Sequence, residues 1–142
     1  MRGIYHLHVL RRLTGRFFNL HGRVIAGEGR GAKLGFPTAN LDIDSQHAIP
    51  ADGIYATRAH IGGKTYKSAT SIGTRPTFNG GNRTIEVYII DFKGNLYGQD
   101  LKIDILKRLR CEIRFASVEE LKKQMAEDVK QSIVVLDSQE KT

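Results

Sequence analysis

Hydrophobic and polar positions alternate along much of the middle of the chain, which is the pattern of strands that bury one face. The alternation runs over residues 53–61 and again over 64–72, on either side of two glycines typical of a tight hairpin turn. The same reasoning, from period and β-branched content, predicts further strands over residues 17–26, 84–92 and 101–106. The pattern therefore predicts a series of short antiparallel strands.

The two ends of the chain follow a helical period. Isoleucine and leucine recur every third residue over 4–14, ahead of Gly15, which predicts a short helix there. Apolar residues recur every three or four positions over residues 118–136 and predict one amphipathic helix. Ser117 and Glu120 have the spacing of a capping box, which marks the start of that helix.

Two polar segments are predicted to connect strands, residues 74–78 as a loop and residues 80–82 as a turn. Five or six short strands followed by one long helix predict a mainly β fold, a small antiparallel barrel with the helix packed on it. Residues 15–137 are predicted to form the single domain, with a connector or helix remnant over 1–14 and a tail over 138–142.

The charge of the chain is concentrated near its start. The 142 residues carry a formal net charge of +7, from 22 Lys and Arg against 15 Asp and Glu. Residues 1–33 hold seven of the basic residues and one acidic residue, whereas residues 34–142 are close to neutral. This distribution argues against a generally cationic surface for polyanions.

Several classes of protein can be excluded from composition. No apolar run approaches the length of a membrane span, and the first residues lack the apolar stretch of a signal peptide. The lone Cys111 cannot form an internal disulfide and suits a reducing compartment, so a cytoplasmic location is expected, with no membrane partner. The five histidines show no metal-ligand spacing.

The segment from residue 27 to residue 35 is the richest in glycine. Closely spaced glycines let backbone amides approach a phosphate, and nearby cations add to the attraction. A flexible hairpin loop with solvated charges is the alternative, and glycine content alone does not decide between them. The segment lacks the Gly-Lys-Ser/Thr of a P-loop. Its candidate phosphate-binding residues are Gly27, Gly29, Arg30, Gly31, Lys33 and Gly35.

Thr38 and Asn40 follow directly, two residues apart, so they point to the same side of an extended segment. A hydroxyl and an amide oxygen suit a hard cation such as Mg²⁺, which also shares phosphate oxygens. The alternative is a Thr and an Asn exposed on an edge strand. The neighbouring glycine segment favours the metal interpretation.

Glu86 interrupts an otherwise apolar strand, where a carboxylate is costly to bury unless it is paired or used. At the barrel mouth it could accept a proton from an alcohol, and on an edge strand it could simply face solvent. Arg75 could hold a phosphate or lie on the surface. Four charged residues at even spacing would share one face of an extended segment, as a rim over a ligand or as an exposed edge: Arg108, Arg110, Glu112 and Arg114.

A different function, binding of single-stranded nucleic acid, is open to a basic barrel with stacking aromatic residues. The candidate platforms are Phe17, Phe18, Tyr55, Tyr66, Phe78 and Tyr88. The near-neutral balance after residue 33, and the lack of Lys and Arg clustered with aromatics on one strand face, argue against this alternative.

Several motifs together resemble the riboflavin kinase family. Gly35-Phe-Pro-Thr-Ala-Asn40 and Arg75-Pro-Thr-Phe78 are the most specific of them. The remaining matches are residues 22–27, 30–34, 50–55, 72–74, 85–86, 91–92, 96–98 and 109–115. The resemblance covers roughly residues 15–130.

The resemblance implies a six-stranded Greek-key-like barrel and transfer of the ATP γ-phosphoryl group to the 5′-hydroxyl of riboflavin, giving FMN. It implies Glu86 as general base, Thr38 and Asn40 as contacts of Mg²⁺ and the phosphates, and Arg110 and Glu112 as part of a flap on the flavin. It adds Pro37 to the nucleotide-binding segment of residues 27–40. A non-catalytic flavin-binding barrel is the weaker alternative.

In bacteria this kinase is usually the C-terminal half of an enzyme that also carries an FMN adenylyltransferase domain. Residues 1–14 are predicted to be the connector to such a domain. This chain is therefore expected to form FMN without forming FAD, with riboflavin and ATP as its partners and with no nucleic-acid partner.

Overall fold

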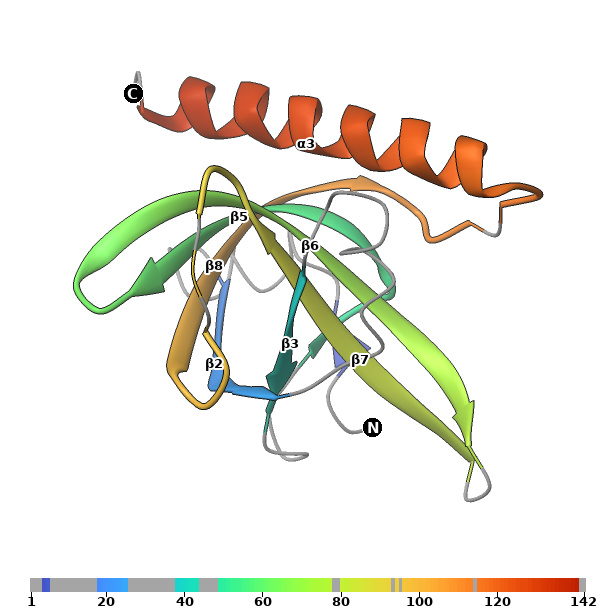
Figure 1. The fold of residues 1–142 in the computed structure, drawn as a ribbon, viewed down its shortest axis with the longest axis horizontal. Helices are drawn as coiled ribbons and strands as arrows, with labels where there is room; N and C mark the ends of the chain where they lie inside the picture. Colours follow the sequence, from blue (N-terminus) through green and yellow to red (C-terminus); the bar gives the residue numbers. More distant parts are fainter. Residues whose placement is uncertain are drawn as a thin grey trace.

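The computed structural model describes residues 4–5, 18–25, 38–43, 49–77, 80–92, 94, 96–113 and 115–140. Six antiparallel strands close into a barrel in the order β2-β3-β7-β6-β5-β8, and helix α3 lies across its outer surface (Figure 1). The predicted six-stranded barrel with one packed helix is confirmed. The barrel strands are β2 (Phe18–Ile25), β3 (Thr38–Asp42), β5 (Gly53–Ile61), β6 (Lys64–Thr77), β7 (Gly80–Ile89) and β8 (Asp100–Arg110).

Two short strands lie outside the barrel. Strand β1 (Ile4–Tyr5) pairs in parallel with β4 (Ile49–Pro50). The helix predicted over residues 4–14 is therefore wrong at Ile4 and Tyr5, because pairing with a distant segment overrides a weak local period. The rest of that prediction falls outside the described residues.

The hairpin of β6 and β7 is longer than the sequence indicated. Residues 74–77 pair with residues 80–83, and Pro76 lies opposite Gly81. The predicted loop over 74–78 and turn over 80–82 are thus wrong at residues 74–77 and 80–82, which are strand. Their polar, glycine-rich composition suggested a connection, but pairing across the hairpin keeps them extended.

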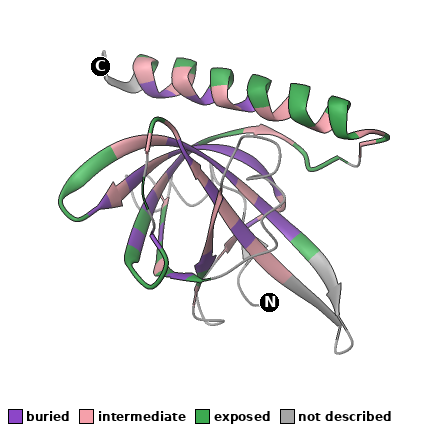
Figure 2. Ribbon diagram, viewed as in Figure 1, coloured by how far each residue is buried: buried purple, intermediate pink, exposed green. Residues whose placement is uncertain are grey.

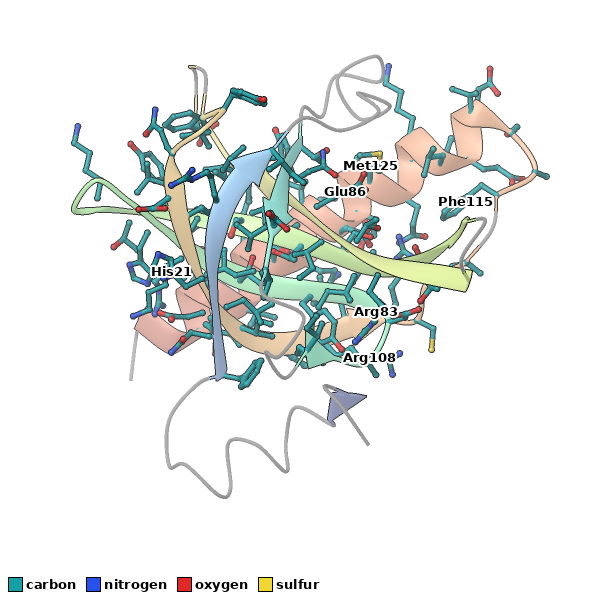
Figure 3. All side chains as sticks on the ribbon, turned by 90° about the horizontal axis from the view of Figure 1, so that it is seen from below. His21, Arg83, Glu86, Arg108, Phe115 and Met125 are labelled. Carbon is teal, nitrogen blue, oxygen red and sulfur yellow. The ribbon has the colours of Figure 1, made fainter. Side chains whose placement is uncertain are left out.

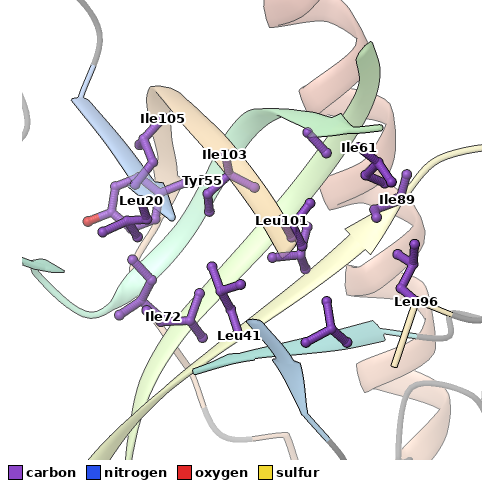
Figure 4. Close-up of a cluster of buried hydrophobic side chains, with 14 residues drawn as sticks. Leu20, Leu41, Tyr55, Ile61, Ile72, Ile89, Leu96, Leu101, Ile103 and Ile105 are labelled. Atoms are coloured by element: carbon purple, nitrogen blue, oxygen red, sulfur yellow. The ribbon is translucent and has the colours of Figure 1, made fainter. Parts of the chain in front are cut away.

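The barrel interior holds one apolar cluster (Figure 4). Three buried hydroxyls lie in the barrel wall beside it: Thr57 Oγ1 is 2.6 Å from Ser68 Oγ and 2.8 Å from Thr70 Oγ1. Each hydroxyl thus has a partner away from water. The buried members of the apolar cluster are Leu20, Val24, Leu41, Tyr55, Ala59, Ile61, Ile72, Ile85, Val87, Ile89, Leu96, Leu101, Ile103 and Ile105.

Helix α3 (Val118–Glu140) packs on β5, β6 and β8 and buries one stripe of side chains against them (Figure 2). The Glu120 amide donates to Ser117 Oγ at 3.2 Å, so the predicted capping serine is confirmed. The Glu120 carboxylate accepts from the Ala116 amide rather than from the serine amide. The helix continues to Glu140, past the predicted end at residue 136, because no glycine or proline follows Leu136.

Arg83 and Arg108 lie near each other on one side of the barrel (Figure 3), and both bond to Asp52, in the segment just before β5. Arg83 donates from Nη2 and Nε to Asp52 Oδ1 at 2.7 and 3.1 Å, and Thr74 donates to Oδ2 at 2.8 Å. Arg108 donates to the Asp52 carbonyl at 2.6 Å. These bonds hold the segment before β5 against β7 and β8. Within the described part of the chain, no helix is long and apolar enough to cross a membrane.

Candidate active site

The candidate metal ligands and the candidate base lie on two paired strands, β3 and β7. Asn40 is directly opposite Glu86, and Thr38 is opposite Tyr88. Ala39 and Leu41 pack against the core, so Thr38 and Asn40 face away from it. The prediction that these two side chains share a side is confirmed. Directly opposed side chains have Cβ atoms about 5 Å apart, which brings Asn40 and Glu86 together.

Glu86 lies on an inner strand of the barrel wall, between β3 and β6. Asn40 is its neighbour on one side and Ser71 its neighbour on the other. Its side chain is half-buried and projects from β7 on the face opposite Ile85 and Val87, which are in the core (Figure 3). The edge-strand interpretation is wrong, because β7 is paired on both sides. The role of Glu86 as a base stays a prediction.

One cross-strand row crosses the whole wall and contains Glu86. Consecutive members are Cα partners in the register of each strand pair. Three strand spacings of about 4.8 Å separate Glu86 from the far end of the row, on the order of 14 Å along the wall. In strand order the row is Ile25, Asn40, Glu86, Ser71, Ile54 and Arg110.

Arg110, at the end of this row, is held by helix α3. Its Nε and Nη2 donate to the two carboxylate oxygens of Asp128 at 2.8 and 2.7 Å. Gln124 Nε2 donates to the same carboxylate at 3.0 Å. The guanidinium lies over the Phe115 ring, 5.7 Å from its centroid, and Nη1 donates to the Cys111 carbonyl. The predicted flavin-flap arginine therefore has a fixed orientation.

Glu112 follows two residues after Arg110, beyond the end of β8, and lies against β6. A Cβ built on Gly73 would be 2.4 Å from Glu112 Oε1, so the absence of a side chain there makes room for the carboxylate. Gly73 is two residues from Ser71, the neighbour of Glu86. Glu112 thus lies on the same face of β6 as the row that contains Glu86.

The prediction that Arg108 and Arg110 share one face is wrong. Arg110 is opposite Ile54 but Arg108 is opposite Tyr55, because the pairing of β5 with β8 shifts register between them. Successive residues of β5 point to opposite faces, so the two arginines diverge. Arg108 contacts Asp52 and Arg110 contacts Asp128.

Other predicted site residues fall outside what the structure describes. These are the candidate nucleotide-binding residues of the glycine segment, the side chain of Arg75, and Arg114. Their predicted roles stay predictions. The residues concerned in the glycine segment and just after it are Gly27, Gly29, Arg30, Gly31, Lys33, Gly35 and Pro37.

Three of the aromatic residues proposed as stacking platforms pack in or against the barrel core. Tyr55 is 1% exposed and its hydroxyl donates to the Ala51 carbonyl at 2.5 Å. Tyr66 packs edge-on against Phe92, and Phe18 packs against the core. These three side chains therefore contribute to the packing of the barrel, whereas the half-buried Tyr88, opposite Thr38, is not part of the core cluster.

The pKa of one titratable group beside Arg83 and Arg108 is shifted by burial. Burial raises the pKa of the Tyr55 hydroxyl, although the positive charges of Arg108 and Arg83 oppose the shift. Tyr55 therefore stays protonated above the pH at which an exposed tyrosine ionises.

Two residues that belong to the site were missed at the sequence level. Ser71 was part of an alternating strand, and only the register places it beside Glu86. Asp128 carries a detectable signal, because Gln124, Asp128 and Ser132 recur every four residues and form a polar stripe within the buried face of α3. A buried polar residue at helical spacing indicates a partner on the opposing sheet.

The donor atoms on β3 fit a hard divalent cation better than a transition metal. No group of three or more His, Cys, Asp or Glu side chains in the described ranges could hold a metal. Thr38 and Asn40 offer a hydroxyl and an amide oxygen on one face, beside the Glu86 carboxylate. An all-oxygen set of low charge suits a cation that keeps water and phosphate oxygens as its other ligands.

A protein-family model described as riboflavin kinase (flavokinase) matches residues 14–136. The bifunctional riboflavin kinase/FMN adenylyltransferase of Bacillus subtilis is 36% identical over 124 residues, which cover 85% of this chain and 39% of that protein. This chain thus spans about two fifths of the length of the curated relatives it matches.

Two solved structures are similar to the barrel. Riboflavin kinase from Trypanosoma brucei superimposes with a TM-score of 0.62 at 26% identity, covering 86% of this chain and 81% of that one. A Streptococcus pneumoniae structure described as a macrolide-efflux protein gives a TM-score of 0.83 at 32% identity, covering 89% of this chain and 41% of that one.

Proposed function

Because this chain belongs to the riboflavin kinase family, whose reaction converts riboflavin to FMN, we propose that it transfers the γ-phosphoryl group of ATP to the riboflavin 5′-hydroxyl. The observation that carries the proposal is the direct cross-strand pairing of Asn40 with Glu86. It joins a candidate phosphate and metal side chain to a candidate base at one point on the barrel wall.

Glu86 is the general base of the proposed reaction. Its carboxylate accepts the proton of the 5′-hydroxyl as the ribityl oxygen bonds to the γ-phosphorus, and the bond to the leaving oxygen of ADP breaks. The partial burial of Glu86 between Asn40 and Ser71 limits access of water, which would otherwise compete as acceptor of the phosphoryl group.

Thr38 and Asn40 would hold Mg²⁺ together with phosphate oxygens of ATP. The cation supplies neutralisation of the negative charge that develops on the transferred group. The segment of residues 27–35 would contribute backbone amides, Arg30 and Lys33 to the remaining phosphates. In this proposal, residues 27–40 bind the nucleotide.

Arg110 and Glu112 bind the flavin ring. Riboflavin is elongated, with the ring system at one end and the 5′-hydroxyl at the other. The separation of Arg110 from Glu86 by three strand spacings suits an elongated molecule that contacts both residues. The uncharged ring offers carbonyl oxygens to the N–H groups of Arg110.

The relatives also carry an FMN adenylyltransferase activity, but this chain matches only two fifths of their length. We propose that the 142 residues form FMN and ADP but no FAD. Incubation with riboflavin, ATP and MgCl₂, followed by separation of the flavins, tests this. Absence of FMN would contradict the proposed function, and formation of FAD would contradict the assignment of a single activity.

Glu86→Gln tests the role of the base. The variant keeps the shape of the side chain but cannot accept the proton, so kcat should fall by about 10²–10⁴-fold. Riboflavin should still bind, and this is measured by the quenching of riboflavin fluorescence when the variant is added. Glu119→Gln, the same substitution at an exposed position in the first turn of α3, is the matched control. A kcat for Glu86→Gln within a few-fold of the control would show that Glu86 is not the base.

A further inference from the structure

We propose that Asp128 on helix α3 is a positioning residue for the flavin, acting through Arg110, with Gln124 as its support. The inference rests on the proposed role of Arg110 in binding the flavin ring. It extends that role to a helix that carries none of the site residues predicted from the sequence.

The contact between Arg110 and Asp128 is bidentate and well shielded. Both carboxylate oxygens accept from the same guanidinium, at 2.8 and 2.7 Å. The side chain of Asp128 is 9% exposed and that of Arg110 is 18% exposed, so solvent screens the pair weakly. Two parallel bonds fix the plane of a guanidinium as well as its position.

The other contacts of Arg110 remove its remaining freedom. The Phe115 ring lies under the guanidinium, and the Cys111 carbonyl accepts from Nη1 at 3.0 Å. Three of the five N–H groups are thereby engaged, which leaves two for a ligand. Asp128 therefore decides the direction in which these two donors point.

The charge of Asp128 also changes what Arg110 can recognise. A buried arginine without a partner would attract anions and would be costly to desolvate. Paired with Asp128, it presents directional N–H donors with little net charge. That combination suits the carbonyl oxygens of an uncharged ring better than it suits a phosphate.

Gln124 supports the carboxylate from one helical turn before it. Its Nε2 donates to Asp128 Oδ1 at 3.0 Å, so this oxygen accepts from both Gln124 and Arg110. Spacing of four residues places Gln124 and Asp128 on the same face of α3. The helix thus delivers two side chains to one guanidinium.

A second ion pair between α3 and the barrel provides a matched control. Lys67 on β6 bonds to Asp137, near the other end of the helix. This pair is more exposed, at 36% for Lys67 and 44% for Asp137. Asp137→Ala removes an aspartate that joins the same helix to the same barrel, at a position remote from Arg110.

The experiment compares steady-state kinetics of the wild type with Asp128→Asn, Asp128→Ala, Asp137→Ala and Arg110→Ala. We expect both Asp128 variants to raise the KM for riboflavin by roughly tenfold or more, the effect of losing a charge-assisted hydrogen bond. The KM for ATP should change by less than about twofold, because no nucleotide residue is moved. Asp137→Ala should leave both KM values unchanged.

The nearly isosteric Asp128→Asn keeps the test open if Asp128→Ala does not fold. Equal increases of both KM values, or an increase for Asp137→Ala as large as for Asp128→Asn, would assign Asp128 to attachment of the helix and overturn the proposal. A raised riboflavin KM in Arg110→Ala with none in Asp128→Asn would overturn it as well. If Arg110→Ala itself has no effect on riboflavin, the flavin-binding role of Arg110 is wrong, and the role of Asp128 falls with it.

Discussion

Asn40 and Glu86 are far apart in the chain and adjacent on the barrel, and the chemistry proposed for them depends on that adjacency. A carboxylate alone on a strand has little function. A carboxylate between an amide and a hydroxyl, on a wall that also offers Thr38, can serve a phosphoryl transfer. The proposed function of each residue therefore depends on its cross-strand neighbours.

Removal of the β3 oxygens should alter the response to magnesium. Asn40→Ala and Thr38→Ala would each remove one proposed ligand of the cation, so we expect roughly tenfold more MgCl₂ to be needed for half-maximal activity, at saturating ATP and riboflavin. Asp42→Ala, an exposed residue at the end of the same strand, is the control. An unchanged magnesium requirement in both variants would remove these residues from the metal site.

Tyr55→Phe should change the dependence of stability on alkaline pH. The pKa of Tyr55 is raised by burial in the folded state, so above the ordinary value of 10.0 the unfolded chain loses this proton first. The stability that Tyr55 contributes is complete below pH 10 and is lost as the pH rises toward the folded pKa. The variant also loses the bond to the Ala51 carbonyl, worth about 1 kcal/mol.

Urea unfolding of both proteins between pH 8 and 10.5 measures this effect. The wild type should be the more stable at pH 8, and the difference should narrow as the pH rises above 10. Tyr97→Phe, at a side chain that is 65% exposed, is the control. If the difference in unfolding free energy between the wild type and Tyr55→Phe stays constant from pH 8 to 10.5, the pH dependence does not come from Tyr55.

The residue types of the site could be predicted from the sequence, but their surroundings could not. Thr38 and Asn40 are two residues apart, so a strand period was enough to place them on one face. The position of Glu86 needed the pairing of β7 with both β3 and β6, which no local pattern contains. Arg108 and Arg110 were predicted to share one face of the strand, and this was wrong because even spacing in the sequence does not reveal a bulge.

Helices and strands with strong local sequence signals were predicted correctly, and those with weak signals were not. The helix at residues 118–140 has a capping serine and a long apolar stripe, and the hairpin at Gly62 and Gly63 has a defined turn sequence. Residues 74–77 and 80–83 lack such signals, and each of the two segments is extended because it pairs with the other. When neither of two paired segments has a local signal for a strand, the secondary structure of each cannot be predicted without knowing the other.

Ser117→Ala tests the contribution of the cap to helix α3. Loss of the bond to the Glu120 amide should destabilise the protein by about 1 kcal/mol, which lowers the Tm by about 3–4 °C for a chain of this size. Ser138→Ala, an exposed position near the other end of the helix, is the matched control. Equal Tm values for the two variants would show that the cap does not stabilise the helix.

Closure of the whole barrel depends on a close approach of two backbones at Gly22. A Cβ at this position would be 2.2 Å from the Asp42 carbonyl oxygen, which belongs to the backbone of β3. A side chain cannot be accommodated without moving one strand. The barrel wall therefore requires glycine where β2 passes β3.

Gly22→Ala should destabilise the protein by about 1–3 kcal/mol through this overlap, as measured by urea unfolding. Because β3 carries Thr38 and Asn40, a shift of the strand should also weaken the response to magnesium. His21→Ala, exposed on the same strand, is expected to leave both properties unchanged. Wild-type stability in Gly22→Ala would mean that β2 and β3 adjust without cost.

The strand order has a consequence for how the protein emerges during synthesis. The β3–β7 pair needs only residues up to 89, so the end of the site proposed to bind the phosphates can form first. The wall closes only after β8 has been synthesised and has paired with β2. Arg110 can bond to Asp128 only after helix α3 has been synthesised. On a ribosome that adds about 5–20 residues per second, the two halves of the site are thus completed in order, and the end proposed to recognise the flavin is the last to be assembled.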